Sequence, residues 1–473
     1  MARMLYKINE FFGLDQSASE NGLTSGMSPD ACNMDTSLGT LSVAKGCTAY
    51  IVQPVPGEET PHRLFLYRSQ SDEQFLVLAG KTLYAYRFGA WESVYEFETL
   101  SDHRFSVVQV QINSTDCLVI GYGENRLIKY DGQTASAFGS AEGASDMPVP
   151  YLATYKGRLF AAGNNSHINR LYFSQLPGDS RTIENWSGVE SSPNVEGGHA
   201  DVGSDGSDPI IGMLALSNQL LIFKRRSIYR VIGDRPSNFT IESVDAVGET
   251  AAHAAFVRVA DAVYYLTGAG LCAFNGVTAR PLNDVRRIRT FLSSANITDA
   301  RGTLARDKLM FLAAENGESA IMEYDLLRRT YMLRRGFTAY DLYARDGAAY
   351  IIDANRQVCR FDDGESYNGL PIRAWWQTPA TDLYEKGTVK AMRSLYLRGF
   401  AITQNSAVIA TVFVGGMNTV HRLLLPEDKS EVLEVPLKNE GRVFSLRFEN
   451  EAGGRFALEG GAELALELWR RVE

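Results

Sequence analysis

Arg158-Leu159-Phe160-Ala161, followed by Gly163 and then by Leu171-Tyr172-Phe173, is the clearest of seven copies of one pattern in this 473-residue chain. Each copy holds two short apolar runs, rich in aromatic and branched residues, with turn-forming Gly, Asn or Asp at the joints. Such residues suit a pleated strand, and the turn residues accept the backbone conformations of tight hairpins. Each copy therefore predicts an antiparallel hairpin.

The copies recur at the spacing of a propeller blade. The first runs lie at residues 75–78, 118–120, 158–161, 219–223, 263–266, 308–312 and 349–352. The second runs begin at Leu83, Leu127, Leu171, Ile228, Leu271, Ile321 and Val358, which are 44, 44, 57, 43, 50 and 37 residues apart. A four-stranded blade takes about 40–50 residues.

These spacings predict an all-β chain with a β-propeller of about seven blades. Hairpins of this kind bury their apolar faces only by stacking on neighbours, and a ring leaves few open edges. An irregular β-sandwich or a β-solenoid with coincidental spacing is the alternative. We expect the 57-residue interval to hold an insertion and the 37-residue interval to mark a trimmed blade.

Two further segments flank the repeats. Residues 1–50 are polar and rich in turns, which predicts an extended N-terminal arm with a short strand or hairpin at about residues 40–52. From about residue 371 the strands become longer and alternate strictly, as in residues 442–448 and 462–468, so that one face is buried. The expected domains are the arm (1–50), the propeller (51–368) and a C-terminal β-sandwich (369–473).

Composition excludes several classes of function. A formal charge of −9 argues against a basic surface that grips nucleic acid. The five cysteines are scattered without C-x-x-C spacing, so they predict neither a disulfide framework nor a zinc site. Because residues 1–14 contain no apolar core of a signal peptide and no run of about 18 apolar residues occurs, we expect synthesis in a cytoplasm and no membrane insertion.

Candidate sites are few. Asp201, Asp205 and Asp208 stand at short spacing with intervening glycines, so they are a weak candidate for a calcium loop. A solvated turn is the favoured interpretation, because the closing Glu of a standard calcium loop is missing. The basic run Lys224-Arg225-Arg226, with Arg230 and Arg235, is interpreted as a blade edge or a contact between subunits rather than a phosphate site. No residue is predicted to be catalytic, and none to bind a cofactor.

Several further stretches of the sequence share a pattern with one known family. They are Phe12-Gly13-Leu14, Pro29, Asn33-Met34-Asp35, Gly39 to Gly46, Arg158 to Gly163, Asn169 to Ser174, Asn185-Trp186, Asp208 to Ile211, Gln219 to Tyr229, Leu395 to Gly399, Phe448 to Asn450 and Gly453 to Phe456. Taken together, these stretches resemble the bacteriophage stabilisation or tail-hub β-propeller proteins of short-tailed phages. The resemblance spans most of the chain, and its motifs are structural.

The resemblance implies a non-enzymatic virion protein of the phage tail or neck, made in the host bacterial cytoplasm. It implies a homo-oligomeric ring, commonly hexameric, below the portal-adaptor complex, where the ring retains the packaged genome. It further implies that double-stranded DNA passes the ring without sequence recognition, and that tail fibres, tailspikes or a plug protein bind to it.

Two other functions stay open at this stage. A propeller at the tail tip would bind a receptor or degrade polysaccharide as a glycosidase or lyase, a chemistry that needs two carboxylates at a fixed separation. The abundance of aromatic residues, 22 Tyr and 23 Phe, could line a sugar groove. A cellular propeller scaffold unrelated to phage is the third possibility.

Overall fold

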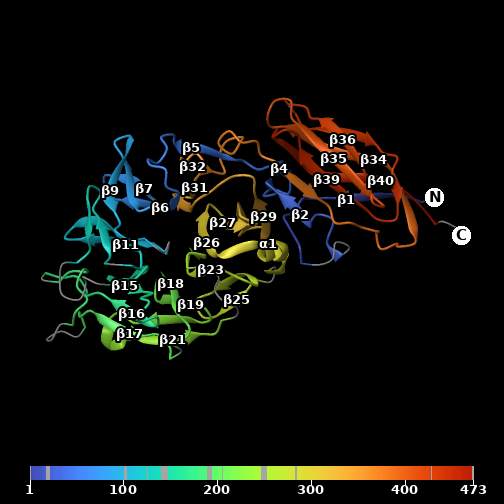
Figure 1. Ribbon diagram of the computed structural model, residues 1–473. Coiled ribbons are helices and arrows are strands. Elements are labelled where there is room, and N and C mark those ends of the chain that lie inside the picture. Colours follow the sequence, from blue (N-terminus) through green and yellow to red (C-terminus); the bar gives the residue numbers. More distant parts are fainter. Residues whose placement is uncertain are drawn as a thin grey trace.

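The computed structural model describes residues 2–17, 22–100, 104–124, 126–139, 147–179, 181–188, 194–204, 206–246, 253–282, 285–427 and 429–470. Its main body is a ring of seven four-stranded antiparallel sheets (Figure 1). The propeller and its seven blades are confirmed. The seven predicted hairpins are the second and third strands of the seven blades.

Blades one to four follow one another along the chain. Their strands are β6 (Pro61–Arg68), β7 (Glu73–Ala79), β8 (Thr82–Arg87) and β9 (Ala90–Glu96); β10 (Ser106–Ile112), β11 (Thr115–Gly121), β12 (Ile128–Tyr130) and β13 (Ala135–Ala137); β14 (Tyr151–Tyr155), β15 (Arg158–Ala162), β16 (Arg170–Phe173) and β17 (Gly198–Asp201); and β18 (Ile210–Ala215), β19 (Leu220–Lys224), β20 (Ile228–Ile232) and β21 (Thr240–Val244). The expected insertion falls between β16 and β17, which end and begin at Phe173 and Gly198.

Blades five to seven complete the ring. Their strands are β22 (Phe256–Val259), β23 (Ala262–Thr267), β24 (Gly270–Phe274) and β25 (Ala279–Pro281); β26 (Ala295–Ala305), β27 (Lys308–Glu315), β28 (Glu318–Asp325) and β29 (Thr330–Arg334); and β30 (Leu342–Arg345), β31 (Ala348–Ile352), β32 (Val358–Phe361) and β5 (Cys47–Ile51). Short helices η2 (Pro236–Asn238), η3 (Val285–Ile288) and α1 (Arg289–Ser294) lie in the connections.

The seventh blade corrects the expectation of a trimmed blade. Its fourth strand is β5, which pairs antiparallel with β32 although it lies far earlier in the chain. The short 37-residue interval arises because the outer strand of this blade comes from the N-terminal segment. At Gly46, just before β5, a Cβ atom would lie 1.9 Å from the carbonyl oxygen of Ser366, so only glycine fits where the closing strand enters.

Apolar faces of neighbouring blades pack together around the ring. Phe65 and Leu76 of blade one share a buried cluster with Leu118 and Ile120 of blade two, and similar clusters join the later blades. Tyr350 of blade seven packs with Phe75 of blade one, so the core is continuous across the seam. The first strands of the blades lie innermost, because β10 contacts β14, β14 contacts β18, β26 contacts β30, and β30 contacts β6.

Two larger sheets hold the C-terminal strands together with strands from the N-terminal segment. The five-stranded sheet has the order β2 (Asp30–Cys32), β33 (Trp375–Gln377), β39 (Phe444–Asn450), β35 (Ala407–Val414) and β36 (Met417–Leu424). The seven-stranded sheet holds β3 (Met34–Asp35), β4 (Leu41–Val43), β40 (Phe456–Arg470), β34 (Thr388–Ala401) and β37 (Glu431–Pro436) in this order, with β1 (Ala2–Ile8) on β40 and β38 (Glu440–Gly441) on β34.

The two sheets share one apolar core. The rings of Tyr6 in β1 and Phe444 in β39 meet edge to face at 5.4 Å, and Phe11 meets Trp376 in the same way at 5.0 Å. Residues 2–43 therefore contribute strands to both C-terminal sheets, and residues 47–51 belong to the ring. In Figure 1 the blue N-terminal strands lie beside the red C-terminal strands.

Candidate functional site

The aspartates of the candidate calcium loop serve different local contacts. Asp208 is buried, and its carboxylate accepts hydrogen bonds from the Arg226 backbone N–H (2.9 Å) and the Ser227 hydroxyl (2.6 Å), which fixes the turn between β19 and β20. Asp201 ends β17 and lies 3.3 Å from the Arg170 guanidinium. Asp205 lies outside the described residues. Among the residues that are described, no three His, Cys, Asp or Glu side chains form a group that could hold a metal ion.

The basic run lies in the same turn, and its side chains point to separate partners. Lys224 is almost fully buried, and its ammonium donates to the Val202 carbonyl at 3.0 Å. Arg230 forms an ion pair with Glu242 across the blade at 2.9 Å. Arg226 donates to the Ser207 hydroxyl at 3.1 Å. These contacts hold one blade together.

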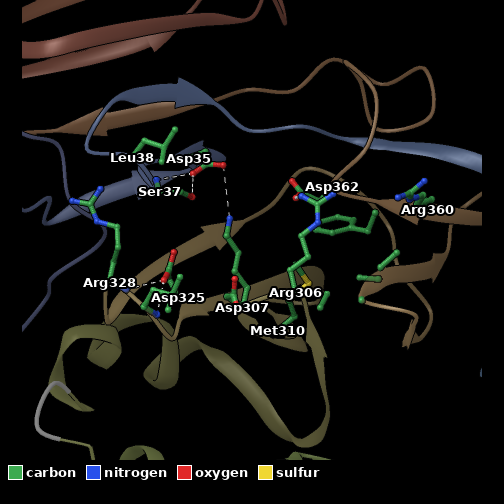
Figure 2. A pocket seen from close by; sticks show the side chains of 17 residues that line it. Asp35, Ser37, Leu38, Arg306, Asp307, Met310, Asp325, Arg328, Arg360 and Asp362 are labelled. Carbon is green, nitrogen blue, oxygen red and sulfur yellow. Dashed lines mark hydrogen bonds and ion pairs between the residues drawn. The ribbon is translucent and has the colours of Figure 1, made fainter. Parts of the chain in front are cut away.

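A more prominent charged site lies where the N-terminal segment crosses blades six and seven. It is a pocket of about 260 Å³ whose wall includes Asp35 and Ser37 on one side and Arg306 and Asp362 on the other (Figure 2). Lys308 also lines the pocket. Leu38 and Leu327 also line it, and both side chains are largely exposed. The pocket therefore offers charged walls beneath an apolar rim.

The wall of this pocket continues inward as a set of matched charges, here called the seam network: Asp35, Lys308, Glu323, Arg334 and Asp362. The Lys308 ammonium lies 3.3 Å from the Glu323 carboxylate and 3.9 Å from that of Asp35. The Arg334 guanidinium lies 3.0 Å from Glu323 and 3.7 Å from Asp362. Two cations thus face three carboxylates, and Arg306 at 3.8 Å from Asp362 supplies the third cation.

Neutral oxygen atoms accept the remaining hydrogen bonds described for the Arg334 guanidinium. It donates to the Lys45 carbonyl and, at 3.4 Å, to the Tyr367 hydroxyl, which in turn donates to Asn33 at 2.8 Å. Asn33 donates to the Arg335 and Arg373 carbonyls. The buried guanidinium therefore joins blade six, blade seven and the N-terminal segment through one continuous set of hydrogen bonds.

Burial and close charges shift the pKa values of this network. The nearby Glu323 carboxylate raises the pKa of Lys308 despite burial of its ammonium. Burial would raise the pKa of Asp35, but Lys308 and the Ser37 hydrogen bonds outweigh it and lower that pKa. Burial raises the pKa of Asp362, against the opposing effect of Arg334. The network therefore keeps its cations charged and sets the two aspartates apart in acidity.

The sequence offered no local signal for the seam network. Lys308 and Glu323 belong to one hairpin, but Asp35 precedes them by more than 250 residues and meets them only because the N-terminal segment crosses the blades. Asp35 belongs to one of the stretches that carry the family resemblance, which implies no role for it.

Two neighbouring open strand edges form a second candidate site, on the C-terminal sheets. Among the described strands, β36 pairs only with β35 and β37 only with β34. The Thr419 hydroxyl of β36 and the side chain of Asn439, which lies between β37 and β38, are 2.9–3.1 Å apart, so β36 contacts the segment that follows β37. Their large exposed apolar side chains are Met417 (72%), Val420 (61%), Leu424 (55%) and Val432 (66%). We call these four residues and their strands the β36–β37 edge.

All five cysteines are buried free thiols. No helix among the described residues is long and apolar enough to cross a bilayer.

Comparison with known proteins gives likeness of fold only. No protein-family model matches the chain, and no curated protein matches it significantly. Solved structures that it resembles include the WD40 domain of Neurospora crassa Pan2, at 9% identity and a TM-score of 0.39, over 67% of this chain and 94% of that one. Another is YCF48 bound to D1 peptide, at 12% identity and a TM-score of 0.34, over 74% and 96%. An exo-β-1,3-galactanase from Phanerochaete chrysosporium has 9% identity and a TM-score of 0.29, over 90% and 100%. These values carry no argument about what this chain binds or does.

Proposed function

We propose that this chain is a structural protein of a bacteriophage virion that assembles into a homo-oligomeric ring, as a tail hub or head-to-tail connector. The observation that carries the proposal is the β36–β37 edge. The family resemblance in the sequence supplies the context: a ring below the portal-adaptor complex that retains the packaged genome, surrounds the DNA channel and supports fibres, tailspikes or a plug.

The edge has the properties of an assembly surface. An open strand edge presents a row of backbone N–H and C=O groups, and proteins that stay monomeric usually protect it with charges, bulges or covering loops. Here Met417, Val420 and Leu424 are exposed along eight residues of β36. A second chain that covered this surface would bury apolar side chains and pair backbone groups at once.

The shape of the molecule suits repeated assembly. The seam network fixes the propeller to the C-terminal sheets, so the β36–β37 edge stands at a set distance and angle from the side wall of the disc. A ring forms when one such surface binds a different surface of the next copy and the rotation closes. A lasting interface of this kind buries more than about 2,000 Å².

Replacing Val420 by Lys tests the proposal. A charge on the exposed edge should weaken assembly without unfolding the chain, because the side chain is 61% exposed. We expect the wild type to sediment as a ring of several copies and Val420→Lys as smaller species. The matched control is Val277→Lys on the rim of blade five, with 66% exposure, which should assemble like the wild type. Monomers of the wild type at all concentrations, alone and with portal-adaptor complexes, would rule the proposal out.

Polysaccharide cleavage is a second candidate function, because one observation favours it. Asp362, with a raised pKa, and Asp35, with a lowered pKa, line the same pocket, and a glycosidase uses one protonated carboxyl group and one carboxylate. Both groups already contact cations of the seam network. We therefore expect no release of reducing sugar from host-surface polysaccharide; release that Asp362→Asn abolishes would favour the enzyme.

A further inference from the structure

The seven-stranded sheet ends in β37 on one side of the pair β40 and β34, and in β1 on the other. β37 belongs to the β36–β37 edge. Among the described strands β1 pairs only with β40, and the Ser25 hydroxyl, which donates to the Lys7 carbonyl at 3.3 Å, covers only the end of its free side. We call this free side of β1 the β1 edge. In the other C-terminal sheet the corresponding terminal strand, β2, is closed, because Ala31 and Cys32 are fully buried and the strand contacts β29 of blade six.

The side chains of β1 alternate between the core and the outer face of the sheet. Tyr6 and Ile8 are buried, and the Tyr6 ring meets an aromatic ring of the facing sheet. Since neighbouring residues of a strand point to opposite faces, Arg3, Leu5 and Lys7 lie on the outer face. The Arg3 side chain is largely exposed and Leu5 is half exposed. The β1 edge therefore carries an apolar side chain between two cations.

The side chains of β37 alternate in the same way. Val435 is buried and Leu433 packs against the shared core, so both face the other sheet. Val432 and Glu434 therefore lie on the outer face, where both are exposed. β37 thus presents an apolar side chain beside a carboxylate.

The two strands carry opposite charges. β1 contains two cations and no carboxylate, and β37 contains two carboxylates and no cation. Lys7 is already paired with a carboxylate of β40, whereas Arg3 lies 3.7 Å from Glu467, which Arg393 holds more closely at 2.6 Å. Glu434 accepts hydrogen bonds from two hydroxyl groups of β34 and, within the described part of the chain, forms no ion pair. Arg3 and Glu434 are therefore the charges that a partner strand can match.

We propose that β37 of one copy pairs with the β1 edge of the next copy, so that one sheet continues around the ring. The inference rests on the proposed function, because it names the surface that the β36–β37 edge binds. The strands β1, β40, β34 and β37 alternate in direction. A rotation about an axis along the strands therefore places β37 antiparallel to the next β1, with the core-facing sides of both sheets on the same side. Backbone hydrogen bonds then join the copies as in the addition of a strand to a sheet edge.

The side chains of the two strands select one register. With Leu5 opposite Val432, Arg3 stands opposite Glu434 on the outer face. In the same register the partly exposed Met4 meets an apolar residue of β37 on the inner face. A shift of one residue would turn the cations of β1 toward the core, and a shift of two would separate Arg3 from Glu434.

Disulfide trapping tests this register. Leu5→Cys combined with Val432→Cys places two thiols opposite each other across the junction between copies, and glutathione disulfide oxidises them while it is reduced to glutathione. We expect covalent chains of several copies on a non-reducing gel, which dithiothreitol returns to single chains. The wild type is the blank, because its five cysteines are buried. The matched control combines Leu5→Cys with Val277→Cys on the rim of blade five, and it should stay a single chain on the gel.

Sedimentation of the same samples separates this inference from the proposed function. Rings of the Leu5→Cys, Val432→Cys variant that show no cross-link would refute the pairing of β37 with β1 and leave the ring standing. Wild-type monomers at all concentrations would refute the ring and the pairing together. Cross-linking of the Val277→Cys control to the same extent would show that the disulfide reports collision, and would contradict the register.

A charge exchange gives a second test. Arg3→Glu and Glu434→Arg should each raise the concentration needed for assembly about fivefold or more, because like charges then stand opposite each other in paired strands. The combined variant should assemble within about twofold of the wild type, because the ion pair is restored with its sign reversed. Arg280→Glu, at an equally exposed site of blade five, is the matched control and should assemble like the wild type. A combined variant that assembles no better than the weaker single variant, with an unchanged unfolding midpoint, would refute the Arg3–Glu434 pair and the register with it.

Discussion

The seam network and the β36–β37 edge are built from opposite kinds of side chain. At the seam, each buried cation faces a carboxylate within 4 Å, as Arg334 faces Glu323 and Lys308 faces both Glu323 and Asp35. Along the β36–β37 edge, large apolar side chains such as Val420 and Val432 are exposed. Matched buried charges fix a junction between segments of one chain, whereas an exposed apolar strand edge offers a surface to another chain.

The largest expected effect comes from breaking the match at the seam. Arg334→Met removes a fully buried guanidinium and leaves Glu323 and Asp362 without it, which should lower the free energy of unfolding by about 3–5 kcal/mol. Chemical denaturation measures the loss. Arg230→Met removes one partner of a half-exposed ion pair and should cost less than about 1 kcal/mol. Similar losses in the two variants would mean that the seam network contributes no more than a surface pair.

The second effect is a pH dependence that the buried His253 creates. The pKa of His253 is about 2 in the folded chain and 6.5 without the folded structure around it. As the pH falls below 6.5, the unfolded chain therefore binds a proton at this imidazole and the folded chain does not. Stability should therefore drop by about 2 kcal/mol between pH 7 and pH 5 on account of this group. Denaturation curves in buffers without phosphate or carboxylate measure the drop, and His253→Gln should remove that part of it. An unchanged pH dependence in His253→Gln would show that the imidazole is not held neutral.

The smallest effect sharpens the contrast. Arg104→Gln removes one of the three cations near His253, so the pKa of His253 should rise, but the imidazole stays neutral at pH 5 and stability at that pH should change by less than about 0.5 kcal/mol. Nuclear magnetic resonance follows the titration, and denaturation at pH 5 follows the stability. A fall in the pKa of His253 on this substitution would contradict the repulsion between Arg104 and the protonated imidazole.

The sequence predicted the parts of the fold that depend on local pattern. The hairpin that contains Leu83 and the six equivalent hairpins were predictable from alternation, turn residues and spacing. In each of them the two paired strands, such as β7 and β8 or β27 and β28, follow one another directly in the chain. The outer strand of blade seven could not, since nothing near Val358 shows that Cys47–Ile51 will pair there. The pairing of β5 with β32, which are separated by most of the chain, depends on closure of the whole ring.

Site prediction was limited by the same cause. Asp201 and Asp208 are close in sequence, which suggested a shared cation, yet each fixes a different piece of blade structure. Arg63, Arg104 and Arg301 are far apart in sequence, so no sequence motif indicates that they lie together. They line one cavity only because the innermost strands of the blades converge. For a closed ring, sequence spacing predicts blades better than it predicts sites on the axis.

The closing strand also sets an order of events during synthesis. β5 emerges from the ribosome about 300 residues before β32, which at roughly 5–20 residues per second is a delay on the order of 15–60 s. Until then β5 is an unpaired strand that contains Tyr50 and is followed by Val52. The nascent chain must keep this segment from pairing with other chains, so co-expressed holdase chaperones should raise the yield of closed rings more than they raise the yield of a propeller whose outer strand follows its own blade.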